Sequence, residues 1–193
     1  EESLSGAQAL VMLQAQIGGE VYDAFVANNI TSTERVLAAC RAQGVDYIVH
    51  ISSSVLNSRA KDFYTETKKA QEDLVVSSGI PNVVLRPTLM FGWFDRKHLG
   101  WLSRFMRLTP VFPIPGSGRY ARQPLYIRDF CRIIQACLER RPVEEIYDIS
   151  GLEVVDYIDI IRAIKSAIGS RTPIVRIPYW TFWSLLKLNA VFD

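Results

Sequence analysis

The chain has 193 residues, of which 49% are hydrophobic, and this suffices for a compact globular domain with a full core. Its 22 Lys and Arg residues nearly balance 20 Asp and Glu residues without a block of like charge, so a nucleic-acid-binding protein is not expected. The three cysteines form no CxxC pair and fall in predicted helices, which favours a reduced, cytoplasmic setting and argues against a metal site.

The first half of the chain alternates predicted strands and helices. Strands are expected at 9–13, 47–51 and 82–86, and helices at about 22–43 and 63–78. Near-continuous apolar strands that alternate with helices are typical of a parallel sheet covered on both faces. The pattern therefore predicts an α/β fold with a doubly wound parallel sheet.

Beyond Gly92 the sequence becomes rich in aromatic residues, arginine and proline. The further expected elements are a short strand near 124–127, a helix at 129–141, a strand at 145–149 and a helix at about 155–168. We expect residues 1–92 to belong to the sheet-forming domain. Residues 93–193 are expected to form a smaller cap, with elements that return to the sheet.

Two apolar features each allow two interpretations. The segment 177–192 is interrupted by Lys187 and is too short to span a bilayer, so a helix packed on the domain is favoured over a membrane-surface contact. Membrane contact is accordingly not expected. A group of aromatic residues after Gly92 is expected to form a cap core, with lining of a substrate pocket as the alternative. These residues are Trp93, Phe94, Trp101 and Phe105.

The stretch 51–74, ISSSVLNSRAKDFYTETKKAQEDL, places a serine run at a predicted strand end and Tyr64 and Lys68 four residues apart on the next helix. A free tyrosine has a pKa near ~10, and an opposite charge within about 4 to 6 Å lowers a pKa by about 1 to 3 units. The Lys68 ammonium is therefore expected to favour the Tyr64 phenolate. Ser54, or its neighbour Ser53, is expected to hold the same substrate oxygen. This arrangement suits proton exchange with a hydroxyl or carbonyl.

Three segments resemble consecutive signatures of the extended short-chain dehydrogenase/reductase superfamily, in its NAD-dependent epimerase/dehydratase branch. They are NNITSTERVLAACRAQGVDYIVHISSS, YTETKKAQE and VVLRPTLMFG, and the resemblance runs from about Ser3 to Ile168. It implies a partial NAD(P)-binding Rossmann fold with a small C-terminal substrate-binding cap. In that family the tyrosine and lysine are the catalytic pair, which implies Tyr64 and Lys68 here, with Ser54 as the third catalytic residue.

The resemblance also implies residues that bind NAD or NADP. Lys68 would hold the nicotinamide ribose hydroxyls, and Pro87 with Leu89 would lie against the nicotinamide. The other expected cofactor contacts are Leu13, Gln14, Ala15, Asn29, Ser53 and Tyr64.

Two arginines are candidates for substrate binding. In sugar-nucleotide enzymes of the family an arginine near this point pairs with the diphosphate, and a guanidinium fork suits that geometry, so Arg119 and Arg122 are the expected anion contacts. Solvated surface arginines are the alternative. The adjoining stretch ARQPLYIRDF also resembles the family, and its Asp129 is expected to be a helix-start carboxylate that accepts from backbone amides.

The sequence departs from the family pattern in the phosphate-binding loop. No Gly-rich loop follows the first strand, and GSGR at 116–119 does not replace it, because no helix pattern begins there. We therefore expect at least one βαβ unit to be missing in front of Glu1. The strand at 9–13 would then be an apolar unpaired edge, and the isolated chain is expected to aggregate or to pair that edge with another chain.

The distance from Ser54 to Tyr64 is only ten residues, shorter than in most sugar-nucleotide epimerases and closer to atypical superfamily members. The leading hypothesis is an NAD(P)-dependent epimerase, dehydratase or reductase that acts on a carbinol of a nucleotide sugar, as a homodimer. The runner-up is a non-catalytic dinucleotide-binding subunit with a structural, assembly or sensing role.

Overall fold

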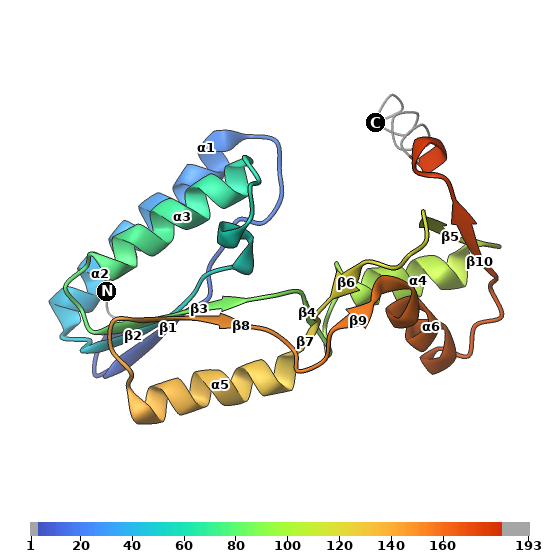
Figure 1. Cartoon of the computed structure of the whole chain (residues 1–193). Helices are drawn as coiled ribbons and strands as arrows, with labels where there is room; N and C mark the ends of the chain where they lie inside the picture. Colours follow the sequence, from blue (N-terminus) through green and yellow to red (C-terminus); the bar gives the residue numbers. More distant parts are fainter. Residues whose placement is uncertain (1–3, 183–193) are drawn as a thin grey trace. The chain divides into compact units, whose positions relative to one another are not determined.

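The structure is a computed structural model that describes residues 4–182, and the chain divides into two compact units (Figure 1). Unit 1 comprises Glu1–Thr88 and Arg128–Ser150, and unit 2 comprises Leu89–Ile127 and Gly151–Asp193. The sequence predicted a boundary after residue 92, with elements of the second part that return to the sheet. The strand at 145–149 pairs with the sheet of unit 1, and its preceding helix belongs to that unit.

Unit 1 contains a four-stranded sheet of order β1-β2-β3-β8 in which all neighbours are parallel. Its strands are β1 (Ala9–Met12), β2 (Tyr47–Ile51), β3 (Asn82–Pro87) and β8 (Glu145–Ile149). The two central strands, β2 and β3, are almost wholly buried, as expected for strands covered on both faces. The predicted strands and the α/β class are confirmed. Strand β1 ends the strand order, and its expected pairing or aggregation in solution stays a prediction.

Helices cover both faces of this sheet (Figure 1). The longer ones are α2 (Ser32–Gln43) and α3 (Phe63–Val76) on one face and α5 (Ile127–Arg140) on the other. Helix α2 ends at Gly44, whose φ of +70° is free of strain only for glycine. Helix α3 begins after Asp62, whose carboxylate accepts a 2.8 Å hydrogen bond from the Thr65 amide. An apolar cluster that includes Leu37, Ile48 and Val75 fills the space between sheet and helices.

The predicted helix over 22–43 is not one regular helix. It consists of α1 (Tyr22–Phe25), the π-helical segment η2 (Val26–Thr31) and α2. The wider turn of η2 places Asn29 inward, where the fully buried side chain accepts from the Gln16 amide at 2.6 Å and donates to the Gln16 carbonyl at 3.3 Å. Short π-helical segments often occur at functional sites. The predicted helix is therefore confirmed in its bounds, and the π-helical segment within it is a feature that the sequence did not predict.

Unit 2 has its own small core, formed by Met106, Phe112, Ile114, Ile158 and Ile161. These residues come from strand β5 (Phe112–Pro115) and from two helices, α4 (Leu99–Leu108) and α6 (Tyr157–Ala167). Strand β10 (Ile174–Ile177) pairs with β5 in parallel, and its partly buried Ile174 packs against this core. The shorter elements are β4 (Met90–Phe91), β6 (Ala121–Arg122), β7 (Leu125–Tyr126) and β9 (Val155–Asp156). The sequence did not predict α4, β5 or β10.

Of the apolar segment 177–192, residues 179–182 are helical and the part from 183 onward lies outside the described residues. Within residues 4–182, no helix has the length and apolar character needed to cross a bilayer.

Strand β2 carries one histidine among apolar residues. His50 is fully buried, and neither ring nitrogen has a hydrogen-bond partner within the described part of the chain. Burial, and secondarily the charge of Lys68, lowers the pKa of His50 from 6.5 to about 3. The folded protein therefore holds His50 neutral, whereas the unfolded chain takes up this proton as the pH falls below 6.5.

This difference predicts that acid destabilises the wild-type protein through His50, and that the variant His50→Leu lacks this contribution. Between pH 6.5 and about 3 the unfolded state binds one more proton at this site, and each unit of pH costs about 1.4 kcal/mol. Between neutral pH and about pH 4, the free energy of unfolding of the wild type should fall by roughly 3 kcal/mol more than that of His50→Leu. Hydrogen exchange of the β2 amides measures this locally. The control is His98→Gln, at an exposed site, and equal acid loss in His50→Leu and wild type would contradict the account.

Candidate functional site

The predicted catalytic residues lie in unit 1 at the carboxyl end of β2 and on α3. Ser54 opens the 3₁₀ turn η3 (Ser54–Asn57), which follows β2 directly. Tyr64 is in the first turn of α3, and Lys68 follows one turn later on the same helix. Ser54 and Tyr64 are half-buried, whereas Lys68 is buried. The three residues therefore belong to one strand–turn–helix segment, as the sequence predicted.

Lys68 is anchored to the end of β2. Its Nζ donates to the carbonyl of Ile51 at 2.9 Å and to Oε1 of Gln71 at 2.5 Å, and the residue is 1% exposed. Burial lowers the pKa of Lys68 from 10.5 to about 8, and the Glu72 carboxylate opposes part of this effect. An ammonium has three N–H donors, and only two have acceptors among the described residues. One donor of a fixed ammonium therefore remains for a ligand oxygen.

A continuous chain of buried amides and hydroxyls holds this lysine in place. Gln71, which accepts from Lys68, donates through Nε2 to Thr33 Oγ1 at 2.9 Å and to the Gln14 carbonyl at 3.3 Å. Thr33 in turn donates to the Asn29 carbonyl at 2.7 Å, and the Asn29 amide donates to Thr67 Oγ1 at 2.9 Å. The chain joins η2, α2, α3 and the residues after β1. Every polar group buried there has a partner, which favours one fixed arrangement.

The serine hydroxyls at the end of β2 have different environments. Ser52 donates to the Glu72 carboxylate at 2.5 Å, and Ser53 accepts from the Val55 amide at 3.3 Å. The hydroxyls of Ser54 and Tyr64 make no hydrogen bond with any described residue. Ser54 is therefore the member of the serine run whose hydroxyl is free to bind a ligand, and Tyr64 has a free phenol.

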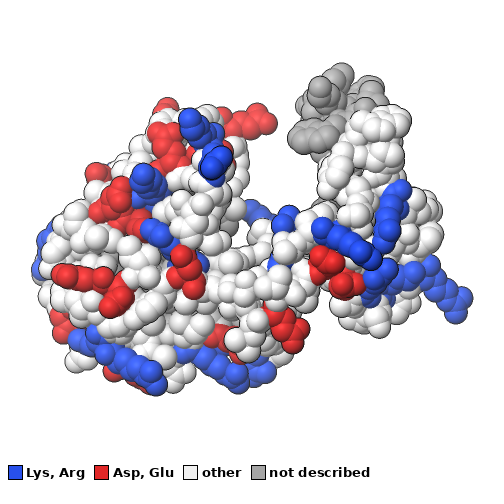
Figure 2. All heavy atoms as spheres, viewed as in Figure 1, with Lys and Arg blue, Asp and Glu red and all other residues white. Residues whose placement is uncertain are grey.

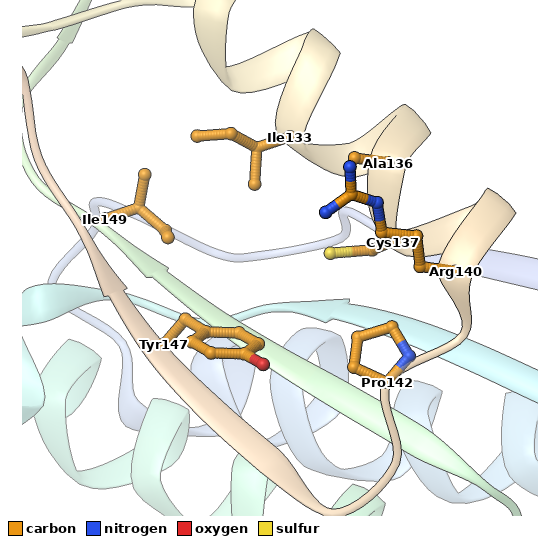
Figure 3. Close-up of a pocket in the computed structure, with 7 residues that line it drawn as sticks. All are labelled: Ile133, Ala136, Cys137, Arg140, Pro142, Tyr147 and Ile149. Carbon is orange, nitrogen blue, oxygen red and sulfur yellow. The ribbon is translucent and has the colours of Figure 1, made fainter.

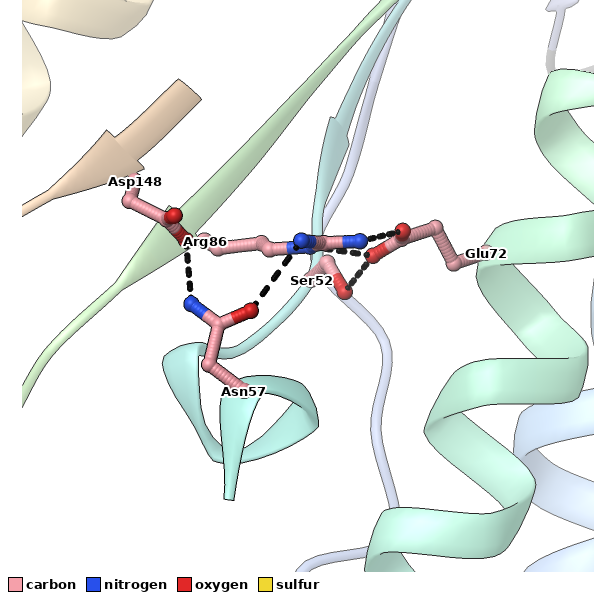
Figure 4. Close-up of polar contacts among 5 residues, drawn as sticks. All are labelled: Ser52, Asn57, Glu72, Arg86 and Asp148. Carbon is pink, nitrogen blue, oxygen red and sulfur yellow. Dashed lines mark hydrogen bonds and ion pairs between the residues drawn. The ribbon is translucent and has the colours of Figure 1, made fainter. Parts of the chain in front are cut away.

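A second polar network, which the sequence did not predict, joins the η3 turn to the sheet (Figure 4). The Arg86 guanidinium on β3 forms an ion pair with the Glu72 carboxylate on α3 and donates to Asn57 Oδ1 at 3.2 Å. Asn57 also donates to the Asp148 carboxylate on β8 at 2.8 Å. Hydrogen bonding to Glu72 raises the pKa of Arg86. The available signal was a charged residue inside the apolar strand NVVLRP, which requires a partner.

The residues expected to contact the cofactor differ in burial and in hydrogen bonding. Gln14 and Asn29 are used in the internal network, with Asn29 fully buried. Leu13, directly after β1, is 65% exposed, and Pro87 ends β3. Ala15 is half-buried, and Leu89 opens unit 2. The segment 116–119 leads to the strand β6, so the expectation that it begins no helix is confirmed.

The two arginines predicted to bind substrate lie in unit 2 and have different surroundings. Arg122 lies over the Tyr120 ring at 5.0 Å from the centroid, and Tyr120 stacks on Tyr157 at 5.0 Å. Arg122 lines a hollow of about 220 Å³ with Lys97, His98, Trp101 and Tyr157 among the other lining residues. Arg119 is exposed and does not line it. Asp129 lies in the first turn of α5 and pairs with Arg132 at 3.0 Å.

The aromatic residues after Gly92 also differ from one another. Phe105 packs on the unit 2 core, and Trp101 stacks on it at 5.1 Å between ring centroids. Trp93 and Phe94 are 73% and 91% exposed. The prediction of a cap core is therefore wrong for Trp93 and Phe94, because the residues between Gly92 and α4 form a surface loop.

Unit 1 has a further hollow of about 320 Å³ between α5 and β8 (Figure 3). Its lining is mainly apolar and consists of Ile133, Ala136, Cys137, Arg140, Pro142, Tyr147 and Ile149. No described group of His, Cys, Asp or Glu in either unit has a metal-binding arrangement.

The Arg86 network predicts a local stability effect. Arg86→Met leaves the Glu72 carboxylate, in a residue only 4% exposed, without its cation, and loss of one partner of such a pair typically costs about 3 to 5 kcal/mol when fully buried. Because Arg86 is partly exposed, we expect roughly 1 to 3 kcal/mol, measured by hydrogen exchange of the β3 amides.

The matched control is Arg132→Met, which removes the exposed ion pair with Asp129. That variant should change stability by less than about 0.5 kcal/mol. Equal effects of the two substitutions would mean that the Glu72–Arg86 pair does not hold the site.

Comparison with known proteins places this geometry in a family. Residues 5–150 match the model of the NAD dependent epimerase/dehydratase family. A ketoreductase of Stigmatella aurantiaca, which acts on 4-hydroxy-2-methyl-3-oxo-4-farnesyl-3,4-dihydroquinoline-1-oxide, is 25% identical over 93% of this chain and 59% of its own length. A ceramide reductase of Caulobacter vibrioides is 24% identical over 90% of this chain and 54% of its own length.

Among solved structures, UDP-glucuronic acid 4-epimerase from Bacillus cereus in complex with NAD superposes with a TM-score of 0.79 and 26% identity. The match covers 91% of this chain and 65% of the epimerase. The chain thus spans between half and two thirds of the length of these relatives. The family match covers most of the chain, and the protein belongs to the NAD-dependent epimerase/dehydratase family.

Proposed function

We propose that the full-length protein is an NAD(P)-dependent epimerase, dehydratase or reductase that acts on a carbinol, or the corresponding ketone, of a nucleotide sugar. The observation that carries the proposal is a difference in hydrogen bonding among the polar side chains of β2, η3 and α3. Lys68 is fixed by two internal acceptors, while the hydroxyls of Ser54, in the turn after β2, and of Tyr64, on α3, have no hydrogen-bond partner among the described residues. Groups that only stabilise a fold are normally satisfied internally.

Each of the three residues has a distinct role in this proposal. Tyr64 exchanges the proton of the substrate hydroxyl, and Ser54 holds the same oxygen, because a serine hydroxyl both donates and accepts. Lys68 follows Tyr64 by one helical turn on α3, and its remaining N–H donor is available for a ribose hydroxyl of the cofactor.

The residues present fit a nicotinamide dinucleotide in part. The unused Lys68 donor suits a ribose hydroxyl, and the ends of β1, β2 and β3 bring Leu13, Ala15, Ser53 and Pro87 to the edge where open α/β sheets bind ligands. The nicotinamide ring would supply the hydride acceptor or donor. No phosphate-binding Gly-rich loop follows β1, so these residues alone are expected to bind the dinucleotide weakly.

The nucleotide-sugar part of the proposal is supported by the hollow around Arg122. It combines three basic side chains, Arg122, Lys97 and His98, with the aromatic rings of Trp101 and Tyr157. Such a lining suits a phosphate anion attached to a flat ring. The Bacillus cereus epimerase, which acts on a UDP-linked sugar by its name, supports the same substrate class.

A second substrate class has its own support. The Stigmatella aurantiaca and Caulobacter vibrioides relatives are reductases of long-chain or isoprenoid compounds by name, and both cover nine tenths or more of this chain. A ketone on such an apolar compound is therefore the competing substrate. The non-catalytic dinucleotide-binding role remains the competing function.

The proposal is tested on the full-length protein with NAD(P)⁺ or NAD(P)H and a panel of nucleotide sugars and long-chain ketones. Nicotinamide absorbance and product identity are followed. Tyr64→Phe should reduce kcat by about 10²- to 10⁴-fold, the usual contribution of a general acid or base, with cofactor affinity retained. Tyr22→Phe, which removes an exposed phenol that donates to Glu66, should leave turnover unchanged.

Turnover that survives Tyr64→Phe would exclude Tyr64 as the proton-exchanging group. Cofactor binding without turnover across the whole panel would favour the structural role instead.

A further inference from the structure

We propose that the loop 92–98 of unit 2, called here the aromatic loop, binds an anionic lipid surface. The loop lies in unit 2, whereas the predicted catalytic residues lie in unit 1, and one of its cations, Lys97, also lines the hollow proposed for the substrate. Trp93 and Phe94 are adjacent at this loop, and their exposed fractions are 73% and 91%. Two adjacent large aromatic residues with such exposure are uncommon on a protein surface and indicate an interaction site.

The backbone of the aromatic loop is constrained, and the loop lines one side of a hollow of about 340 Å³ with Met90, Phe91 and Ile127. Phe94 has a φ of +65°, a conformation that a bulky residue rarely adopts and that requires support from its surroundings. The support comes from Asp95, whose carboxylate accepts from the amides of Lys97 at 3.1 Å, His98 at 2.8 Å and Gly100 at 3.0 Å.

Two further contacts hold the loop against α4. The Arg104 guanidinium donates to the Arg96 carbonyl. A Cβ at Gly100 would lie 1.7 Å from the Asp95 carbonyl oxygen, so the backbones approach too closely for any other residue. The exposed rings therefore lie on a turn whose backbone is constrained by hydrogen bonds and by close packing against α4.

Charge around the loop points to an anionic partner. Arg96 and Lys97 follow the aromatic pair directly, both are exposed, and neither forms an ion pair with a described residue. The only acidic residue between Leu89 and Ile127 is Asp95, which is committed to backbone amides, against six Lys or Arg residues.

The asymmetry extends over the whole of unit 2. Its described residues carry ten basic and four acidic side chains, a net charge of +6, while the whole chain has +2. Lys and Arg side chains accordingly stand out on the visible surface of this unit (Figure 2). Because the whole chain has a smaller net charge than unit 2, unit 1 has no such excess of basic residues.

Exposed aromatic residues followed by cationic residues, as in the aromatic loop, are typical of segments that bind at the membrane–water interface. The rings enter the boundary between headgroups and acyl chains, and the Arg and Lys side chains stay with the anionic headgroups. A single-stranded nucleic acid would require cations along a groove with bases stacked between them. Here the aromatic pair and two free cations are confined to one turn, which favours the lipid surface.

The test is cosedimentation of the purified full-length protein with vesicles of phosphatidylcholine, with and without phosphatidylglycerol. We expect binding to the anionic vesicles that weakens with added salt. Phe94→Gly keeps the backbone conformation, since glycine adopts positive φ freely, and removes the ring. It should weaken partitioning roughly tenfold or more. Arg96→Gln and Lys97→Gln should each weaken it about fivefold.

Leu152→Ser is the matched control, because Leu152 is a fully exposed apolar residue of the same unit next to Glu153. It should leave partitioning unchanged, and circular dichroism should show that all variants fold. The proposal is overturned by absence of binding to anionic vesicles, or by equal weakening in Phe94→Gly and Leu152→Ser. Competition by a single-stranded oligonucleotide, or self-association that Phe94→Gly abolishes, would assign the loop to another partner and overturn it as well.

Discussion

A buried ammonium fixes the arrangement of the candidate site. Lys68 lies almost out of contact with water, where a charge is costly unless it is hydrogen-bonded, and it meets the Ile51 carbonyl and the Gln71 side chain. The first contact ties α3 to the end of β2, and the second ties the lysine to the polar chain that runs through Thr33 to Asn29. The contacts that hold α3 over the sheet are thus the same contacts that hold the Lys68 ammonium, which has a role in the proposed chemistry.

The Arg86 network adds a second constraint one turn further along the same face of α3. Lys68 and Glu72 are one turn apart on the helix, and each is bound to a different part of the sheet. Asn57 extends the Arg86 contacts to the η3 turn that begins with Ser54. The η3 turn and α3 are therefore held by two separate sets of polar contacts, while the hydroxyls of Ser54 and Tyr64, which we propose to be catalytic, have no hydrogen-bond partner among the described residues.

Local sequence patterns were sufficient for much of unit 1. The apolar runs gave the four strands because parallel strands buried on both faces contain few polar residues, and Gly44 marked the helix end. The π-helical segment around Asn29 was not predicted, and its buried Asn29 bonds to Gln16, thirteen residues away in sequence, a contact that local patterns do not reveal. The exposure of Trp93 and Phe94 was missed since hydrophobicity predicts burial, and here Asp95 and Gly100 set the backbone instead.

The state of Lys68 is the most direct measurement of this account. The titration of its Nζ can be followed by NMR on protein with ¹⁵N-labelled lysine, with assignment by Lys68→Arg. The structure predicts one lysine with a pKa lowered from 10.5 to about 8 by burial. If instead all six lysines of the chain titrate together near ~10.4, the amine is solvated and is not held at the end of β2, which contradicts the account.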